Sequence, residues 1–327
     1  MGEFELLARV RERLPALSAR VHLGSGDDAA VTVPGGATAT SVDALVEGVH
    51  FRREGRSLAQ IGRKALATAL SDLAAMGAEP GEAYVVLGVP ADLDEDGCLE
   101  LLDGIVELAA STRTCLAGGD VTRAPVLMLT TTVVGHAPRP ERFVRRAGAQ
   151  AGEALVVTGE LGGAGAGLLL LDRPEAASAV PAAVAESLRA RQLDPRPRLD
   201  AGLAMAGAGA TAMIDISDGL GGDAAHLAES SGVRLRIDAA AIPLAGGVAE
   251  VAAAAKADPL QLAASSGEDY ELLATMPQER LDAAAAAVGA AEDIPLTRIG
   301  EVLAGDGVEI RLPGGGLLEP AGFDQLA

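Results

Sequence analysis

Aromatic side chains are almost missing from this sequence, and their scarcity limits what its core can be made of. The 327 residues include no Trp, four Phe and two Tyr, whereas hydrophobic residues in total reach 49%. A core must therefore be filled mainly by Ala, Val, Leu and Ile, and the length allows two domains of ordinary size. A row of aromatic rings that stacks the bases of single-stranded nucleic acid is excluded.

The charge balance is strongly acidic. Lys and Arg together number 26 and Asp and Glu 46, which gives a formal net charge of -20. A field of this sign repels nucleic acid and anionic lipid, so neither is expected as a partner. The total charge is explained most simply by the solubility of an alanine-rich protein. An acidic protein that handles phosphates nevertheless needs cations, and divalent metals are the first to consider.

Signals for targeting and for disulfide formation are lacking. Cys98 and Cys115 do not have the CxxC spacing, and we expect buried thiols rather than a disulfide or a zinc site. The first residues contain no apolar run of the signal-peptide type, and no stretch reaches the length of a transmembrane helix. We therefore expect a cytoplasmic protein without a membrane partner.

Hydrophobic periodicity predicts a mixture of helices and strands. Helices are expected over residues 4–14, 57–76, 94–111 and 223–231, and strands over residues 38–42, 84–89, 114–117, 126–135, 154–158, 210–216 and 234–238. Residues 137–150 are rich in Pro and Arg, which is typical of a connector. The elements lack the regular alternation of one doubly wound sheet. The pattern predicts a two-domain α/β or α+β chain with its boundary in the connector.

Aspartates recur at the ends of apolar runs, beside Gly and Ser. Six segments share this pattern: GDDAAV from Gly26, TSVD from Thr40, LSDL from Leu70, GGD from Gly118, DISDG from Asp215 and SGEDY from Ser266. Such turns supply the hard oxygen ligands that Mg²⁺ and Ca²⁺ prefer. EF-hand spacing is absent, and His and Cys are too few and too scattered for zinc or copper. Magnesium on bridged phosphates fits best, although any single Asp–Gly turn is more simply a solvated turn or a helix cap.

Asp72 differs from the other aspartates because it lies in an apolar helix, among Leu66, Leu70 and Leu73. A carboxylate in such a place needs a partner, since burying an unpaired charge is costly. A metal ion is a natural partner, so we single out Asp72 as a candidate ligand.

Residues 159–167 form a glycine-rich stretch between a predicted strand and a predicted helix. No GK[ST] follows its GxGxxG-like spacing, and neither Lys64 nor Lys256 lies on a glycine loop. A Walker P-loop is therefore excluded. A dinucleotide-binding fold would need an acidic residue at a strand end about 20 residues later, and Asp172 and Glu175 do not fit. We favour tight packing of helix and strand over a phosphate-binding loop.

Two positions are left open by the residues alone. Arg145 and Arg146 in the connector could contact a phosphate bidentately or only cover an acidic surface. His50, which follows Asp43 closely, is as compatible with a structural role as with a functional one.

Taken in order, these motifs resemble the thiamine-monophosphate kinases, a family in the superfamily of aminoimidazole ribonucleotide synthetase-like ATP enzymes. Seven collinear segments over nearly the whole chain carry the resemblance, which makes it far more specific than any one of them. They are GEFELLAR from Gly2, GSGDDAAV from Gly24, TSVDALVEGVHF from Thr40, ALSDLAAMGAEP from Ala69, LAGGDVTRAP from Leu116, DISDGLGGD from Asp215 and SGEDYELL from Ser266.

The resemblance implies a fold and a reaction. It implies an N-terminal α/β domain and a C-terminal α+β domain, with the N-terminal domains pairing in a homodimer. With the boundary placed by composition, these are residues 1–137, a connector over residues 138–150 and residues 151–327. The implied reaction converts ATP and thiamine monophosphate into ADP and thiamine diphosphate with the help of several Mg²⁺ ions.

The resemblance also implies site residues. Metal ligands fall on Asp28, Ser41, Val42, Asp43, Asp72, Asp120, Asp215 and Asp218. ATP contacts fall on Gly119, Asp120, Arg146 and Ser217, and contacts to thiamine monophosphate fall on His50, Glu268 and Phe323. Relatives often carry a hydroxyl residue where this chain has Val42, so Val42 is expected to act through its main chain. Phe323 rests on a short match only.

The implied acceptor is a phosphate that is mostly dianionic near neutral pH, because its second pKa is about 6. We therefore expect direct in-line transfer with charge neutralisation and no residue acting as acid or base.

Two alternative functions remain. One alternative is another ATP-using member of the superfamily, and a second is a catalytically silent module that binds ATP or metal. A selenophosphate synthetase should have a reactive Cys near its start and a hydrogenase-maturation relative a cysteine tail, and neither is present. The intact carboxylates argue against a silent module.

Overall fold

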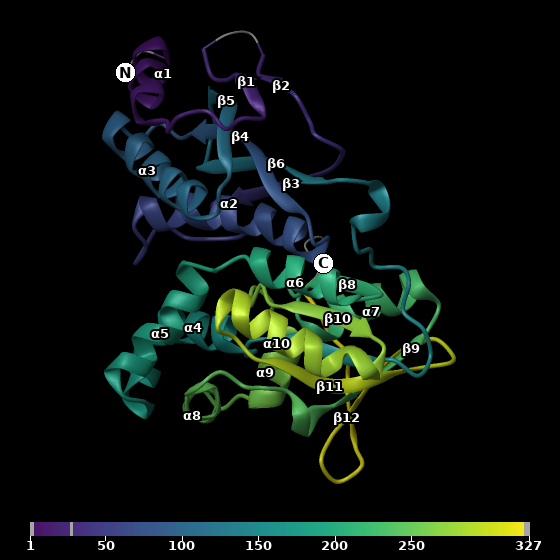
Figure 1. Cartoon of the computed structure of the whole chain (residues 1–327). Helices are drawn as coiled ribbons and strands as arrows, with labels where there is room; N and C mark the ends of the chain where they lie inside the picture. The colour runs from purple at the N-terminus through teal and green to yellow at the C-terminus, as the bar shows by residue number, and fades with distance from the viewer. Residues whose placement is uncertain (1–2, 27–28, 324–327) are drawn as a thin grey trace. The chain divides into compact units, whose positions relative to one another are not determined.

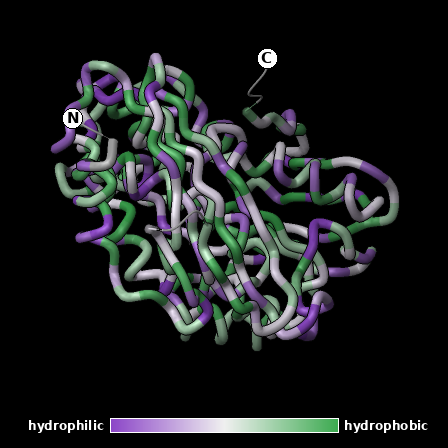
Figure 2. The backbone as a smooth tube through the Cα atoms, turned by 90° about the horizontal axis from the view of Figure 1, so that it is seen from above, coloured by the Kyte–Doolittle hydropathy of each residue, from purple (hydrophilic) through white to green (hydrophobic). Residues whose placement is uncertain are grey.

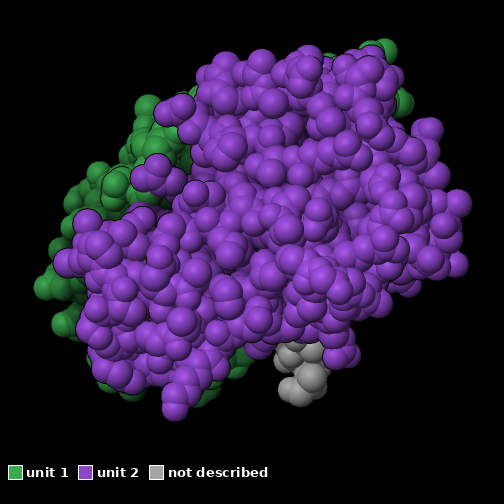
Figure 3. Space-filling model, turned by 90° about the horizontal axis from the view of Figure 1, so that it is seen from below, with its two compact units in different colours: residues 1–73, 78–142 green, residues 74–77, 143–327 purple. Residues whose placement is uncertain are grey.

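The chain folds into two compact units. The computed structural model describes residues 3–26 and 29–323 (Figure 1). The N-terminal unit comprises Met1–Leu73 and Ala78–Arg142, and the C-terminal unit comprises Ala74–Gly77 and Phe143–Ala327. Figure 3 colours the two units separately.

The N-terminal unit is built around a four-stranded sheet. Its elements are α1 (Glu3–Arg13), β1 (Val21–Leu23), β2 (Val31–Thr32), β3 (Ala37–Val46), α2 (Leu58–Ala75), β4 (Glu79–Val89), α3 (Glu95–Ser111), β5 (Cys115–Arg123), β6 (Met128–Ala137) and η1 (Pro140–Arg142). The strand order β3-β6-β4-β5 makes β3 and β5 the edge strands. β4 and β5 are parallel, and the other neighbours in this sheet are antiparallel. β1 and β2 pair separately.

Side chains of this sheet alternate between two faces. On the buried face, Thr131 and Val133 of β6 are at most 1% exposed, whereas Val42 on the outer face is 59% exposed. Residues in register share a face. One row on the buried face joins Asp43, Thr131, Val85 and Gly119, and the next row, on the outer face, joins Ala44, Thr130, Val86 and Asp120.

Two glycines allow α2 and α3 to pack closely. A Cβ atom at Gly62 of α2 would lie 2.0 Å from the Leu101 carbonyl oxygen, and one at Gly104 of α3 would lie 2.0 Å from the Ala59 carbonyl oxygen. The main chains can approach this closely only where side chains are absent. The predicted helices over residues 57–76 and 94–111 are confirmed by α2 and α3.

Two predicted strand ends are wrong. We expected strands to end just before Asp43 and before residues 118–120, but β3 continues to Val46 and β5 continues to Arg123. Asp43 and Asp120 therefore lie inside strands rather than at their ends. Both strands are edge strands, where charged side chains are well tolerated.

The C-terminal unit is built around a seven-stranded sheet in the order β13-β12-β9-β11-β7-β10-β8. Its strands are β7 (Ala154–Thr158), β8 (Ala212–Asp215), β9 (Arg234–Asp238), β10 (Leu272–Met276), β11 (Leu296–Leu303), β12 (Gly307–Arg311) and β13 (Leu317–Leu318). Its helices are α4 (Gly163–Asp172), η2 (Pro174–Ala179), α5 (Ala182–Leu193), α6 (Leu199–Ala208), α7 (Leu220–Ser231), η3 (Ala239–Ala241), α8 (Val248–Ala254), α9 (Pro259–Ser265), η4 (Gln278–Arg280) and α10 (Leu281–Glu292). β12 is parallel to β9, and the other neighbouring pairs are antiparallel.

The main core of this unit confirms the prediction of an aliphatic interior. Its buried residues come from β7 to β12, from α7 and α9 and from the connections between elements, and all of them are Ala, Val, Leu or Ile. Hydrophobic residues recur along the whole backbone (green in Figure 2). Cys98 and Cys115 are free, buried thiols, as predicted. Among the described residues, no helix combines the length and hydropathy needed to cross a bilayer.

Candidate active site

An acidic loop, residues 215–219, follows β8 at the edge of the seven-stranded sheet. Asp215 ends β8 and is 4% exposed, and Ser217 and Asp218 are half-buried. Gly219 has a φ of +112°, which side-chain-bearing residues rarely adopt, and the chain turns there into α7. Two predicted metal ligands, Asp215 and Asp218, and the predicted ATP contact Ser217 therefore lie on one loop.

The main chain of the acidic loop is held by a buried carboxylate that was not predicted. One oxygen of Asp223 accepts hydrogen bonds from the N–H groups of Ser217 (3.0 Å), Asp218 (3.0 Å) and Gly219 (3.1 Å). Burial raises the pKa of Asp223 to about 8, and the charges of Asp215 and Asp218 act in the same direction. The predicted helix start at Asp223 is wrong, because α7 already begins at Leu220.

Carbonyl groups of the acidic loop are engaged as well. The Ser217 oxygen accepts a hydrogen bond from the Glu268 N–H (2.8 Å), and the Asp218 oxygen accepts one from the Phe323 N–H (2.9 Å). All N–H groups of residues 217–219 already bind Asp223. The loop also carries the side chains of Asp215, Ser217 and Asp218, whose oxygens are of the type that cations prefer.

Glu268 lies in a strained segment. Its φ is +59°, and that of Tyr270 is +50°. Positive φ is uncommon outside glycine and is often found at functional sites. The Glu268 carboxylate accepts a hydrogen bond from Nε2 of the buried Gln192 (2.6 Å). The segment thus holds Glu268 in a defined position beside the acidic loop.

The C-terminal segment, residues 320–323, passes close to α7. A Cβ atom at Gly222 would lie 3.0 Å from the Gly322 Cα, and one at Gly221 would lie 2.9 Å from the Ala321 N and O atoms. Phe323, which is bonded through its N–H to the acidic loop, has a side chain that is 56% exposed. Glu268 and Phe323, the two residues of this unit that were predicted to contact thiamine monophosphate, are therefore both hydrogen-bonded to the acidic loop.

The glycine-rich segment, residues 159–167, leads from β7 into α4. Asp269 accepts hydrogen bonds from the Gly162 N–H (2.7 Å) and the Ala164 N–H (3.1 Å). Burial raises the pKa of Asp269 to about 7 against the effect of these bonds. A Cβ atom at Gly167 would lie 2.1 Å from the Leu188 carbonyl oxygen. A carboxylate and a neighbouring helix thus occupy this segment, which agrees with packing rather than phosphate binding.

Arg146 lies on the connector, with an exposed side chain. Its carbonyl oxygen accepts a hydrogen bond from Ser231 Oγ (2.9 Å) at the end of α7. The carbonyl oxygen of the neighbouring Arg145 accepts one from the Met213 N–H (3.0 Å) in β8. The main chain here is fixed, while the Arg146 guanidinium is left accessible, and its contact with ATP stays a prediction.

In the N-terminal unit, β3 carries Ser41 and Asp43 on the buried face of the sheet. The Ser41 hydroxyl donates a hydrogen bond to the carboxylate of Asp72 on α2. Asp72 therefore has a protein partner where we had expected a metal ion, and that partner is itself a predicted ligand. The Val42 side chain lies on the outer face and is apolar, so Val42 can bind a metal ion only through its main chain.

Asp120 lies on the outer face of the sheet, on the strand farthest from Asp43. β3 and β5 are three strand spacings apart, which is about 14 Å. Direct ligation of magnesium needs about 2.1 Å, so the two carboxylates cannot share one ion within one chain. At the neighbouring position only glycine can be accommodated, because a Cβ atom on Gly119 would lie 2.0 Å from the Val85 carbonyl oxygen.

His50 follows the end of β3 in a tight turn. Its Nδ1 accepts a hydrogen bond from the Val46 N–H (3.1 Å), so the neutral ring carries its proton on Nε2. That proton is a hydrogen-bond donor for a ligand. Asp28, the remaining predicted metal ligand, lies outside the described residues.

The donors fit magnesium by their chemistry. In the parts of the chain that the structure describes, no three His, Cys, Asp or Glu side chains are gathered to hold a metal ion. Magnesium is usually held by one or two carboxylates together with waters and substrate phosphates, so a ready-made cage is not required. Asp215, Ser217 and Asp218 in one unit and Ser41, Asp43 and Asp72 in the other are all oxygen donors.

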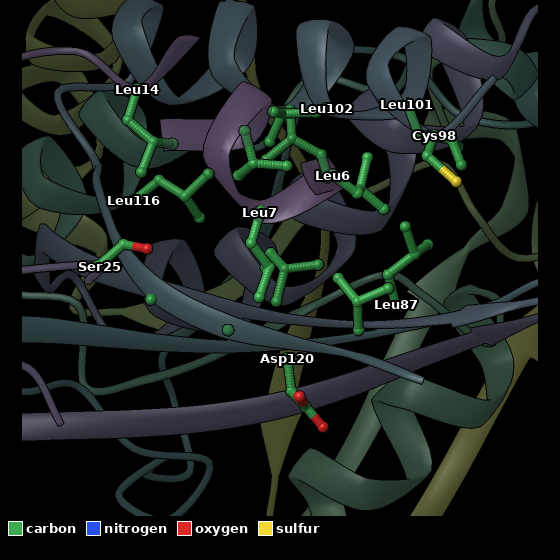
Figure 4. Close-up of a pocket in the computed structure, with 16 residues that line it drawn as sticks. Leu6, Leu7, Leu14, Ser25, Leu87, Cys98, Leu101, Leu102, Leu116 and Asp120 are labelled. Atoms are coloured by element: carbon green, nitrogen blue, oxygen red, sulfur yellow. The ribbon is translucent and has the colours of Figure 1, made fainter. Parts of the chain in front are cut away.

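An apolar cavity of about 80 Å³ lies between α1, α3 and strands β4 and β5 (Figure 4). Leu6, Leu101 and Leu116 line it, and residues 118–121 form part of its wall. In Figure 4 the Asp120 side chain points away from these apolar side chains. The volume is well below the roughly 300 Å³ of a small ligand pocket, so the ATP contacts of Gly119 and Asp120 stay predictions.

Comparison with known proteins identifies the class of protein. Residues 26–137 match the N-terminal domain of AIR synthase related protein, and residues 150–313 match its C-terminal domain. The fold is also similar to that of the hydrogenase maturation protein HypE, with a TM-score of 0.77 at 20% identity, over 96% of both chains. The two-domain architecture with mixed sheets is therefore confirmed.

More similar proteins narrow this class. Thiamine-monophosphate kinase of Escherichia coli K12 is 38% identical over 93% of this chain and 91% of its own length. The crystal structure of thiamine-monophosphate kinase from Stenotrophomonas maltophilia K279a has a TM-score of 0.81 at 38% identity, covering 94% of both chains. AaThiL complexed with AMPPCP and TMP has a TM-score of 0.77 at 30% identity, covering 98% of this chain and 94% of that one. The chain belongs to the AIR synthase related family and, within it, to the thiamine-monophosphate kinases.

Proposed function

We propose that this chain transfers the γ-phosphoryl group of ATP to thiamine monophosphate and so forms thiamine diphosphate and ADP. Thiamine-monophosphate kinases that align over most of the chain support this function. The similar structure complexed with AMPPCP and TMP supports both the nucleotide and the acceptor. Within this chain, the acidic loop supports the function best, because it gathers the oxygen-bearing side chains of Asp215, Ser217 and Asp218 on a main chain that Asp223, Glu268 and Phe323 hold in place.

The acceptor needs little acid–base chemistry. A phosphate monoester with a second pKa of about 6 is already mostly dianionic near neutral pH, so no residue has to remove a proton. The main barrier is repulsion between two polyanions. Magnesium, when bound, neutralises this charge and aligns the phosphates for in-line transfer.

The residues of the chain then bind and orient. Asp215 and Asp218 of the acidic loop are proposed metal ligands, as are Ser41, Asp43 and Asp72 around β3. Asp28, Val42 and Asp120 complete the proposed ligand set. Gly119, Asp120, Arg146 and Ser217 are proposed to contact ATP, and Arg146 is suited to this because its guanidinium can bind phosphate bidentately.

His50, Glu268 and Phe323 are proposed to bind thiamine monophosphate. The acceptor carries a cationic thiazolium ring, which a carboxylate complements, and Gln192 holds the Glu268 carboxylate in place. Phe323 offers an exposed apolar ring, and its N–H binds the Asp218 carbonyl oxygen, one residue after the carbonyl that binds the Glu268 N–H. His50 offers an Nε2 proton to an acceptor oxygen or nitrogen.

We propose further that two copies pair through the outer face of the four-stranded sheet. This face presents Val42, which is 59% exposed, together with Ala44, Thr130 and Thr132, none of which is charged. Asp120 lies on the same face, so pairing would bring it near the second copy. Sedimentation equilibrium should give twice the mass of one chain, and Val42→Lys should shift the protein toward the monomer.

The test of the proposed function is product formation. Incubation with ATP, Mg²⁺ and thiamine monophosphate should yield thiamine diphosphate and ADP in equal amounts, and EDTA should abolish both. Transfer from ATP that is chiral at the γ-phosphorus should invert its configuration, as expected for one in-line step. Hydrolysis of ATP without thiamine diphosphate would point to another acceptor, and retention of configuration would contradict direct transfer.

A further inference from the structure

We propose that Asp223 is a positioning residue for the acidic loop: by fixing the main chain of residues 217–219, it orients the side chains of Ser217 and Asp218 for their ligands and keeps Glu268 and Phe323 in place. The inference rests on the proposed function of that loop and assigns a role to a residue outside its predicted ligands.

The geometry around Asp223 is specific. Its side chain is buried, and a single oxygen, Oδ2, receives all three N–H groups of residues 217–219 at 3.0 to 3.1 Å. Three successive N–H groups that converge on one point form a concavity that attracts anions. Asp223 fills this concavity from inside the protein. These three N–H groups are thereby kept from binding a phosphate, and the side chains of Ser217 and Asp218 extend from a fixed main chain.

The same bonds link the loop to the proposed acceptor residues. Carbonyl groups of Ser217 and Asp218 each receive one N–H, from Glu268 (2.8 Å) and Phe323 (2.9 Å). The Ser217 carbonyl shares its peptide unit with the Asp218 N–H, and the Asp218 carbonyl shares its unit with the Gly219 N–H, so Asp223 holds the other end of both peptide groups. A loop released from Asp223 would therefore move Asp218 and both acceptor residues together.

Asp258 provides a matched control in the same unit. It caps α9 by accepting hydrogen bonds from the Leu260 N–H (2.8 Å) and the Gln261 N–H (2.9 Å). Asp258→Ala therefore also removes a carboxylate from main-chain N–H groups at a helix start, and it does so without touching the acidic loop.

The first experiment measures amide hydrogen exchange in the metal-free protein. The amides of Ser217, Asp218 and Gly219 should exchange slowly in the wild type and in Asp258→Ala, and at least about tenfold faster in Asp223→Ala. This readout needs neither metal nor activity, so it stands even if the wild type fails to form thiamine diphosphate. Equal exchange rates in Asp223→Ala and the wild type would overturn the proposal.

The second experiment measures steady-state kinetics. Asp223→Ala should raise the Mg²⁺ concentration for half-maximal rate and the KM for thiamine monophosphate by about 10- to 100-fold, as for other residues that orient metal ligands. A purely structural loss would lower only the active fraction, so a fall in kcat with unchanged Mg²⁺ dependence and KM would overturn the proposal.

Asp223→Asn keeps the test decisive if the alanine variant does not fold. Its single amide oxygen can still accept the three N–H groups, so the amides should stay protected and both kinetic constants should rise less than about tenfold. Fast exchange at residues 217–219 in Asp223→Asn, combined with wild-type Mg²⁺ dependence and KM, would contradict a positioning role.

Discussion

Two strand–loop–helix segments of the C-terminal unit are both rich in glycine and differ in the side chains that they carry. One runs from β7 through the glycine-rich segment into α4, and the other runs from β8 through the acidic loop into α7. In both, an aspartate side chain accepts hydrogen bonds from main-chain N–H groups at or just before the helix start: Asp269 in the first and Asp223 in the second. N–H groups that could otherwise bind an anion are therefore engaged by a carboxyl group in each segment.

The difference lies in the side chains that remain. Apart from Glu160, which pairs with Arg191, the glycine-rich segment contains only glycines and apolar residues. Gly167 lies against the main chain of α5. The acidic loop keeps Asp215, Ser217 and Asp218 around engaged peptide groups. Glycine content alone therefore does not make a phosphate site, and the destination of the N–H groups together with the remaining side chains decides what is bound.

The largest effect is expected from Asp218→Asn. Losing one electrostatic stabiliser of the transition state costs about 2.7–4 kcal/mol, so kcat should fall by about 100-fold or more. Steady-state formation of thiamine diphosphate measures this, with thermal unfolding as the check on folding. Asp238→Asn, which alters the cap of η3 in the same unit, should leave turnover unchanged. Wild-type turnover in Asp218→Asn would remove Asp218 from the site.

The comparison also predicts that the glycine-rich segment matters for stability and not for nucleotide binding. Gly167→Ala would place a Cβ atom 2.1 Å from the Leu188 carbonyl oxygen, and overpacking of this kind costs about 1–3 kcal/mol of unfolding free energy. Urea unfolding should show this loss while the KM for ATP stays unchanged.

Gly207→Ala is the matched variant for this prediction, because Gly207 also lies in a helix and its Cβ would have nothing within 4 Å. It should be neutral or stabilising by up to about 1 kcal/mol. A several-fold rise in the KM for ATP in folded Gly167→Ala would show that the glycine-rich segment does bind phosphate.

A smaller effect is expected from Gly222→Ala. The added Cβ would lie 3.0 Å from the Gly322 Cα, so the C-terminal segment must shift by a few tenths of an ångström. A displacement of 1 Å can cost about 100-fold, and a several-fold rise in the KM for thiamine monophosphate is therefore expected, with kcat nearly unchanged. If Gly222→Ala and Gly207→Ala have equal KM values, residues 320–323 do not contribute to acceptor binding.

Local patterns were enough to predict much of the fold. The helices over residues 57–76 and 94–111 follow from apolar periodicity, and Asp94 caps the second of them by accepting a hydrogen bond from the Gly97 N–H (2.9 Å). The predicted strand ends at Asp43 and Asp120 were wrong because both residues lie in edge strands, which tolerate charged side chains in their interior. Which strands are at the edge depends on contacts between distant segments, and hydrophobic periodicity carries no information about these contacts.

The contacts that the predicted site residues make could not be predicted from the sequence. Ser41 and Asp72, predicted separately as ligands, are hydrogen-bonded to each other across 31 positions of the chain. Asp269 accepts a hydrogen bond from the Gly162 N–H, 107 positions away in the chain, and no local motif predicts that contact. Asp223 lies within the DISDGLGGD motif, yet its role depends on a turn that brings its carboxylate back to residues 217–219.

The most direct test of this account is a titration with Mn²⁺, which binds oxygen ligands like those of Mg²⁺ and can be counted by electron paramagnetic resonance. In the presence of AMPPCP, Asp218→Asn should bind fewer Mn²⁺ ions than the wild type, or bind them at least about tenfold more weakly. Gly167→Ala should match the wild type. Unchanged Mn²⁺ number and affinity in Asp218→Asn, or a loss in folded Gly167→Ala, would contradict the assignment of cation binding to the acidic loop.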